Sequence, residues 1–220
     1  MDRHFQHELE SLKTMLIKMG SVVEDNISNA LQALLEQKGS LAQKVFENET
    51  RINTLELEID NAIFDLLALQ QPVASDLRFI IASQKINNDL ERIGDHAVNI
   101  AESDLNLLKI KPIDSLLELP KMAVTTKTML RNALDSFILL DPKLAQTVLE
   151  TDDQIDELNR SMTVSVIELL KSDRHTIECG LEFIRISRNL ERIADISTNI
   201  AEEVIFHTQA RVVKHHAEEK

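Results

Sequence analysis

LERIGDHAVNIAE, at residues 90–102, recurs as LERIADISTNIAE at residues 190–202, with nine identities in thirteen positions at an offset of 100. A second pair of segments, LAQKVFE at 41–47 and LAQTVLE at 144–150, shares five identities in seven positions at an offset of 103. Internal repeats constrain a fold more strongly than local propensity does. The chain is therefore predicted to consist of two similar halves. The offset between the two halves thus changes by three residues along the chain. Loops absorb such length differences and helices do not, so the change should fall between helices, near 70–72 and 171–173.

Residues that interrupt helices are scarce in this chain. Its 220 residues include four Gly and four Pro, and good helix formers such as Leu, Glu, Lys, Gln and Ala fill the stretches between them. Turns are expected at Gly39-Ser40 and at Asp141-Pro142, where the proline can begin a helix. We predict an all-α protein whose six helices lie near residues 2–37, 41–70, 75–108, 115–139, 143–171 and 174–209.

Long helices joined by such short turns must run antiparallel. Each half is therefore predicted to be a three-helix bundle, and the whole chain to be two tandem bundles related by internal duplication. The first bundle is expected at residues 1–108, a linker at 109–114, the second bundle at 115–209 and a frayed tail at 210–220.

The composition excludes several classes of function. With 37 acidic and 24 basic residues the formal net charge is −13, which repels nucleic acid and anionic lipid surfaces. No apolar run approaches a membrane span, and the first residues lack the apolar core of a signal peptide. We expect a cytoplasmic protein that neither binds nucleic acid nor inserts into a membrane. The single cysteine, Cys179, is expected to be a buried, inert thiol.

One face of the third helix of each half carries acidic and amide side chains. On an ideal helix, residues such as Leu90 and Ile93 form an apolar core stripe, and the acidic set points away from it. Two explanations are open for this set: carboxylates that merely solvate a helix, with Arg92 and Arg192 as local ion-pair partners, or a binding face. The residues concerned are Glu91, Asp95, Asn99 and Glu102, and in the second half Glu191, Asp195, Asn199 and Glu202.

Duplication favours the binding face. A solvated surface is free to drift between two copies of a helix, yet the Glu, Arg, Asp, Asn and Glu of this face are identical in both. Carboxylates four residues apart lie about 6 Å from each other, near enough to bridge metal ions. An all-oxygen set with an amide suits hard cations such as Mg, Mn, Ca or iron rather than copper.

Signatures of catalysis are not found. The sequence has no Glu-x-x-His of an inward-facing di-iron centre, no Gly-rich phosphate loop and no nucleophile elbow. His96 has no counterpart in the second half, so we expect a solvated or capping role for it rather than metal ligation. We therefore predict that the chain is not an enzyme.

These motifs resemble the PhoU family over essentially the whole chain. The resemblance rests on Leu-Glu-Arg-Ile-x-Asp with its following Asn, at 90–99 and 190–199, and on QPVASDLR at 71–78. It implies two three-helix bundles with an outer-surface metal cluster on each Glu/Asp-x-x-x-Asp motif. The implied ligands are Glu91, Asp95, Glu191 and Asp195. Their neighbours on the same face extend the set: Asn99, Glu102, Asn199 and Glu202.

The resemblance also implies a function. Members of the family act as negative regulators of phosphate uptake and of phosphate-starvation genes. They are thought to link the ATPase subunit of a phosphate ABC transporter to the sensor histidine kinase of a two-component system. We expect an adaptor of this kind, forming a homodimer and binding divalent or trivalent metal ions. The alternatives are a metal-dependent enzyme that uses the surface carboxylates, and a bundle with a purely structural role.

Overall fold

The computed structural model describes residues 3–72, 74–110 and 117–209. Within these ranges the chain forms helices only, which confirms the predicted all-α class. A short 3-10 helix, η1 (Arg174–Thr176), precedes the last α-helix. The α-helices are α1 (Arg3–Glu36), α2 (Gly39–Gln70), α3 (Ala74–Leu107), α4 (Leu119–Leu139), α5 (Pro142–Ser172) and α6 (Ile177–Gln209).

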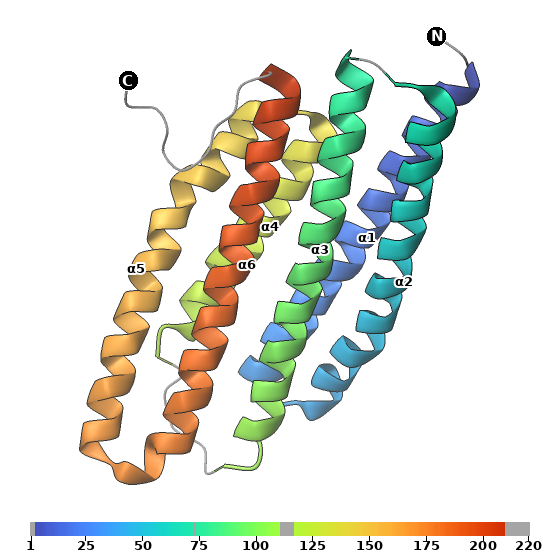
Figure 1. Cartoon of the computed structure of the whole chain (residues 1–220). Coiled ribbons are helices and arrows are strands. Elements are labelled where there is room, and N and C mark those ends of the chain that lie inside the picture. The colour runs from blue at the N-terminus through green and yellow to red at the C-terminus, as the bar shows by residue number, and fades with distance from the viewer. Residues whose placement is uncertain (1–2, 73, 111–116, 210–220) are drawn as a thin grey trace.

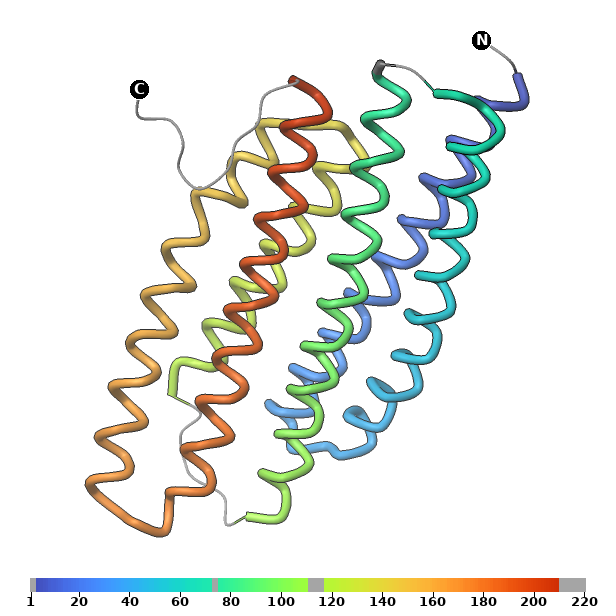
Figure 2. The backbone as a smooth tube through the Cα atoms, in the orientation of Figure 1, coloured from blue at the N-terminus to red at the C-terminus, as the bar shows by residue number. Residues whose placement is uncertain are grey.

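The six α-helices of the described residues form two three-helix bundles, which lie side by side (Figure 1). Each of α1, α2 and α3 packs against the other two, and α4, α5 and α6 repeat the arrangement. The bundles meet mainly through α3 and α6, which run antiparallel down the middle of the molecule (Figure 2), while α1 makes a smaller contact with α4. The third helix of each half is therefore also the main interface between the halves.

The predicted core stripe is confirmed in both halves. Leu90 and Ile93 of α3 are fully buried, and so are Leu190 and Ile193 at the repeated positions of α6. Burying a Leu or Ile side chain contributes about 1.5–3 kcal/mol relative to leaving it exposed. The stripe consequently fixes how each third helix is rotated, and with it the direction in which the acidic residues point.

The first turn lies two residues earlier than predicted. Gln37 adopts a left-handed conformation with φ of 54°, Lys38 is extended, and Gly39 is already the first residue of α2. The turn therefore does not use the conformational freedom of the glycine. Instead, an added Cβ at Gly39 would lie 3.1 Å from the Leu108 side chain, so the missing side chain allows the start of α2 to approach the end of α3 closely.

The corresponding turn of the second half has the same backbone and better capping. Leu140 takes the left-handed conformation with φ of 51°, and Asp141 is extended. The Asp141 carboxylate accepts hydrogen bonds from the backbone N–H groups of Lys143 at 2.9 Å and Leu144 at 3.2 Å. Pro142 begins α5, as predicted.

The remaining boundaries agree with prediction within two residues, apart from the starts of the fourth and sixth helices. The sixth α-helix begins at Ile177 rather than at 174, because η1 occupies residues 174–176. The start of the fourth helix differs by four residues. That helix begins at Leu119 rather than at 115, because Leu117 has a positive φ of 53° and Pro120 suits the first turn of a helix. The change of repeat offset falls between α2 and α3 and between α5 and α6, where it was expected. Residues 111–116, which include most of the predicted linker, and the predicted tail at 210–220 lie outside the described residues.

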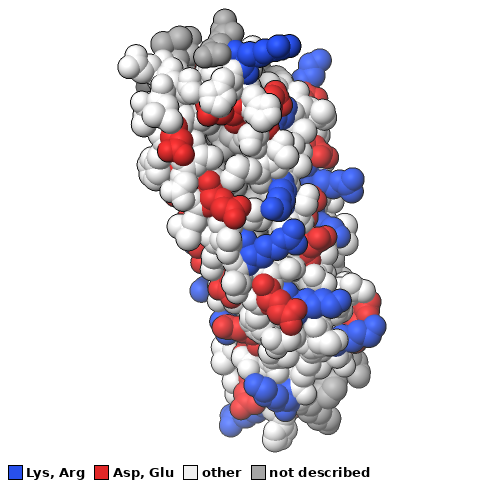
Figure 3. Space-filling view, turned by 90° about the vertical axis from the view of Figure 1, so that its right-hand side faces the viewer, with Lys and Arg blue, Asp and Glu red and all other residues white. Residues whose placement is uncertain are grey.

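The distribution of charged side chains on the surface fits the mixed, net acidic composition of the chain. On the side of α1 and α2, basic and acidic side chains are intermingled rather than gathered into one basic field (Figure 3). Across the described ranges, no helix is both long and apolar enough to span a bilayer.

Candidate functional site

The two Glu-x-x-x-Asp pairs lie halfway along α3 and α6. Glu91 is half-buried and Asp95 is exposed on α3, whereas Glu191 and Asp195 are both half-buried on α6. Because the buried stripe is fixed by packing, these side chains project beside the second helix of their own half. Each pair consequently meets carboxylates from that neighbouring helix.

In the first half, α2 adds two carboxylates to the pair. Burial raises the pKa of Glu91, and the charges of Asp95, Glu56 and Glu49 raise that pKa further. Arg92 opposes the rise only in part. Glu56 and Glu49 lie on α2, so we define the first acidic cluster as Glu49, Glu56, Glu91 and Asp95.

In the second half, α5 supplies the additional carboxylate. Burial raises the pKa of Glu191, and the charges of Asp195 and Asp156 add to this effect while Arg192 opposes it. Burial likewise raises the pKa of Asp195, although Arg192 donates a hydrogen bond to it at 3.2 Å. We define the second acidic cluster as Asp156, Glu191 and Asp195.

The sequence prediction missed the carboxylates of α2 and α5. A signal for them exists, because Glu49 and Asp152 occupy equivalent positions of the repeat at the offset of 103. Asp156, by contrast, corresponds to Asn53, so the repeat alone does not identify it.

Glu102 is exposed and Asn99 is half-buried, and both contact the other half of the molecule. Arg185 of α6 donates to Glu102 Oε2 at 2.6 Å and to Asn99 Oδ1 at 3.4 Å. The wheel of a single helix cannot reveal this contact, since it depends on α3 packing against α6. In the second half, Asn199 is exposed and Glu202 is half-buried.

Local ion pairing accounts for part of the conserved pattern. Arg192 pairs with Asp195, but Arg92 pairs with Asp89 at 3.1 Å rather than with Asp95. The identical Arg residues therefore have different partners in the two halves. Solvation with local ion pairs does not by itself explain why the acidic residues are identical.

The clusters have suitable donors for a metal ion but are not assembled around one. Within the described part of the chain, no three His, Cys, Asp or Glu side chains converge on a point where they could hold a metal ion together. The donors are carboxylate oxygens, which suit hard cations. Each cluster could hold such an ion through two carboxylates, with water as the remaining ligands.

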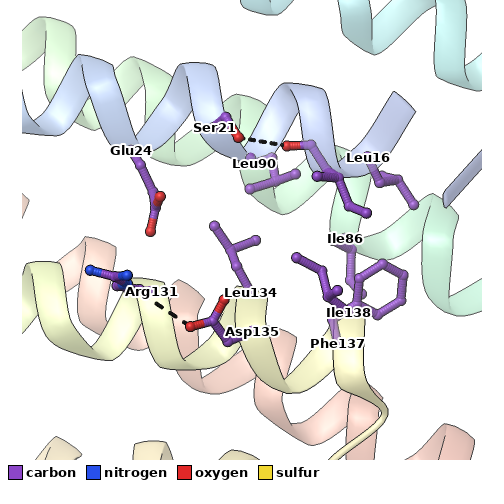
Figure 4. A pocket seen from close by; sticks show the side chains of 12 residues that line it. Leu16, Ser21, Glu24, Ile86, Leu90, Arg131, Leu134, Asp135, Phe137 and Ile138 are labelled. Carbon is purple, nitrogen blue, oxygen red and sulfur yellow. Dashed lines mark hydrogen bonds and ion pairs between the residues drawn. The ribbon is translucent and has the colours of Figure 1, made fainter. Parts of the chain in front are cut away.

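A separate cavity of about 160 Å³ lies between α1 and α4. Apolar side chains such as Leu16, Ile86 and Phe137 line one end, while Glu24 and the pair Arg131–Asp135 stand at the other (Figure 4). No residue of either acidic cluster lines it. The volume lies below the roughly 300–1,000 Å³ of typical small-molecule pockets.

Known proteins share this architecture. A family model described as the PhoU domain matches the chain twice, at residues 16–103 and 119–204. A phosphate-specific transport system accessory protein PhoU homolog from Aquifex aeolicus is 36% identical over 214 residues, covering 97% of each chain. Homolog 1 from Thermotoga maritima is 36% identical over 204 residues, covering 92% of this chain and 88% of that protein.

Solved structures agree with the sequence comparisons. The crystal structure of PhoU from Pseudomonas aeruginosa matches with a TM-score of 0.90 at 35% identity, covering 94% of this chain and 100% of that one. The phosphate transport system regulatory protein PhoU from Streptococcus pneumoniae matches with a TM-score of 0.88 at 30% identity, covering 96% of this chain and 100% of that one.

Proposed function

The chain belongs to the PhoU family, and from that premise we propose that it is a negative regulator of phosphate uptake and of the phosphate-starvation response. The observation that carries the proposal is the extent of the match. Both halves match the family domain, and the relatives matched over nearly their whole length bear names of phosphate-transport accessory and regulatory proteins.

The proposed mode of action is that of an adaptor on the cytoplasmic side of the membrane, working as a homodimer. Its partners are the ATPase subunit of a phosphate ABC transporter and the sensor histidine kinase of the phosphate two-component system. Large exposed apolar side chains support docking of proteins, because such residues mark interaction surfaces when they gather. Phe64 of α2 and Ile167 of α5 are exposed at equivalent positions of the repeat, with Leu57 and Val164 nearby on the same helices.

Metal binding belongs to the same proposal. The ligands are the paired carboxylates of α3 and α6, assisted by carboxylates of α2 and α5, and the ion is iron, Mn, Mg or a similar hard cation. Mutual repulsion within each cluster favours cation binding. To act as ligands, Asn99 and Glu102 would first have to break their contacts with Arg185. On α6, Asn199 and Glu202 complete the proposed ligand set.

The enzyme alternative gains no support from the cavity between α1 and α4. A catalytic metal needs an open coordination position beside an enclosed pocket. The carboxylates of the two clusters lie elsewhere.

The regulatory role can be tested with a reporter driven by a phosphate-starvation promoter. In a strain that lacks this gene and grows with ample phosphate, we expect high expression, and the wild-type gene should restore repression. If expression stays as low as in the parent strain, and the protein captures neither the transporter ATPase nor the kinase, the regulator proposal is wrong.

The metal role needs its own measurement. Protein purified without chelator should contain metal, and Asp95→Ala combined with Asp195→Ala should remove most of it. The matched control is Glu10→Ala combined with Glu178→Ala, which removes two exposed carboxylates outside the clusters. Unchanged metal content in the Asp95/Asp195 variant would exclude these clusters as the sites.

A further inference from the structure

Polar contacts align α3 with α6 along the interface between the two halves. From one end to the other, Lys85 Nζ donates to Glu203 Oε1 at 2.6 Å, and His96 Nδ1 donates to Asn189 Oδ1 at 2.8 Å. These are followed by the Arg185–Glu102 pair and by Asn106 Nδ2, which donates to Glu182 Oε1 at 2.9 Å. In this antiparallel register, Asp104 of α3 lies opposite Glu182 of α6.

Three carboxylate oxygens at this point lack hydrogen-bond donors. Asp104 is only 4% exposed, and both of its side-chain oxygens are buried without a partner. Glu182 Oε1 accepts from Asn106, but Glu182 Oε2 is also buried and unpartnered. A buried oxygen without a partner costs about 1–3 kcal/mol, and more if it is charged. Such a group in a native fold points to a missing water, proton or ion.

Two neighbouring basic groups are bonded to other residues. Lys109 Nζ donates to Asn106 Oδ1 at 3.4 Å. The guanidinium of Arg185, about one turn along α6, is bonded to Glu102 and Asn99. Burial and, to a smaller extent, the charge of Glu182 raise the pKa of Asp104 to about 8. Burial and then Glu182 also raise the pKa of Cys179 to about 11. The thiol on α6 thus also experiences the negative charge of Glu182.

We propose that Asp104 and Glu182 together bind a divalent cation between α3 and α6. Two carboxylates carry the charge that one divalent ion neutralises. Their oxygens select hard ions such as Mg²⁺, Mn²⁺ or Ca²⁺, with water filling the remaining positions. The hydrogen bond from Asn106 holds the Glu182 carboxylate in place over α3.

This site differs from the two acidic clusters in kind. At the repeat offset of 100, Asp104 corresponds to Val204 and Glu182 to Ala82, so the site occurs once and breaks the internal duplication. Its two ligands come from different halves, whereas each acidic cluster is defined within one half. An ion bound here therefore fastens the two bundles together.

The test uses Mn²⁺ as the probe on the full-length chain, first stripped of metal with chelator. Asp104→Asn and Glu182→Gln each remove one ligand charge, and Glu10→Gln is the control because Glu10 is an exposed carboxylate on α1, outside this site and both acidic clusters. All four proteins also carry Asp95→Asn and Asp195→Asn, which suppresses binding at the acidic clusters. We expect one Mn²⁺ equivalent per chain by electron paramagnetic resonance in the parent and the control, and its loss in both ligand variants.

Anomalous diffraction from Mn²⁺-soaked crystals locates the ion. A peak between Asp104 and Glu182 is expected in the wild-type protein and should vanish in Glu182→Gln. Asp104→Asn relieves the repulsion without changing side-chain shape, so this variant should stay folded, as circular dichroism would show. If no peak occurs there at saturating Mn²⁺, or if Glu182→Gln binds as much as the control, the proposal is overturned and a proton on Asp104 explains the pair.

Discussion

Arg185 of α6 forms an ion pair of 2.6 Å with Glu102 of α3, and Lys85, its equivalent at the repeat offset of 100, forms one of 2.6 Å with Glu203 of α6. Each half thus extends a basic side chain from the same position of its third helix to an acid of the other half. The interface between the bundles is therefore approximately two-fold symmetric. The two ion pairs differ in burial, however, and that difference sets their contributions to stability.

Lys85→Met should destabilise the protein more than Arg185→Met. The Glu203 side chain is 10% exposed, so removal of Lys85 leaves a mostly buried carboxylate without its partner, at a cost of about 1–3 kcal/mol. Glu102 is 48% exposed and is hydrated when Arg185 is removed, so that loss should stay below about 1 kcal/mol. Urea unfolding measures both values. Equal losses would show that the burial of Glu203 does not matter.

The two turns that begin α2 and α5 make a second pair for comparison. Lys38 and Asp141 have almost the same backbone, with φ of −107° and −100°, but only Asp141 caps its helix with a side chain. Asp141→Ala should cost about 0.5–2 kcal/mol of unfolding free energy. Lys38→Asp should gain up to about 1 kcal/mol, because it supplies the missing cap to the same geometry, while the ion pair with Glu36 that it removes is exposed and contributes little. Thermal unfolding of both variants provides the check, and a Lys38→Asp variant less stable than wild type would contradict the argument.

The contrast between these turns illustrates which features of the fold can be predicted from the sequence and which cannot. Helical periodicity and the repeat identified six helices and the rotation of α3, because both depend on short-range spacing and on a core stripe that packing enforces. The left-handed residue of the first turn is Gln37 rather than a glycine, a choice that local propensity does not predict. The contact of Arg185 with Glu102 depends on packing between the halves, which the pattern of one helix does not encode. For the same reason, Asp104 is not among the predicted site residues, since its neighbour Glu182 lies on a helix of the other half.

Cys179 should react slowly in the folded protein. Its pKa is raised from 9.0 to about 11, so the reactive thiolate fraction at pH 8 falls about 100-fold, and burial restricts access further. We expect alkylation by iodoacetamide at pH 8 to be at least 100-fold slower in native protein than in urea. Because the chain has one cysteine, mass spectrometry of the intact protein follows the reaction directly. Comparable rates in both conditions would contradict the buried, negatively charged surroundings of the thiol.

The two bundles should unfold as one cooperative unit. Their interface runs along α3 and α6, and both helices also contribute to the core of their own half. If one half unfolds and its third helix is lost, the interface face of the other third helix therefore becomes exposed. Ile93→Ala and Ile193→Ala remove fully buried side chains at equivalent positions, and each should cost about 2–5 kcal/mol.

If the halves are coupled, either substitution should lower the midpoint of a single calorimetric transition, with the van't Hoff enthalpy still equal to the calorimetric one. Independent halves would instead give two transitions, and each substitution would shift only the transition of its own half. Asp104→Asn serves as the control variant in metal-free buffer: it relieves repulsion at the interface between the halves and leaves both cores intact, so it should raise the midpoint without splitting the transition.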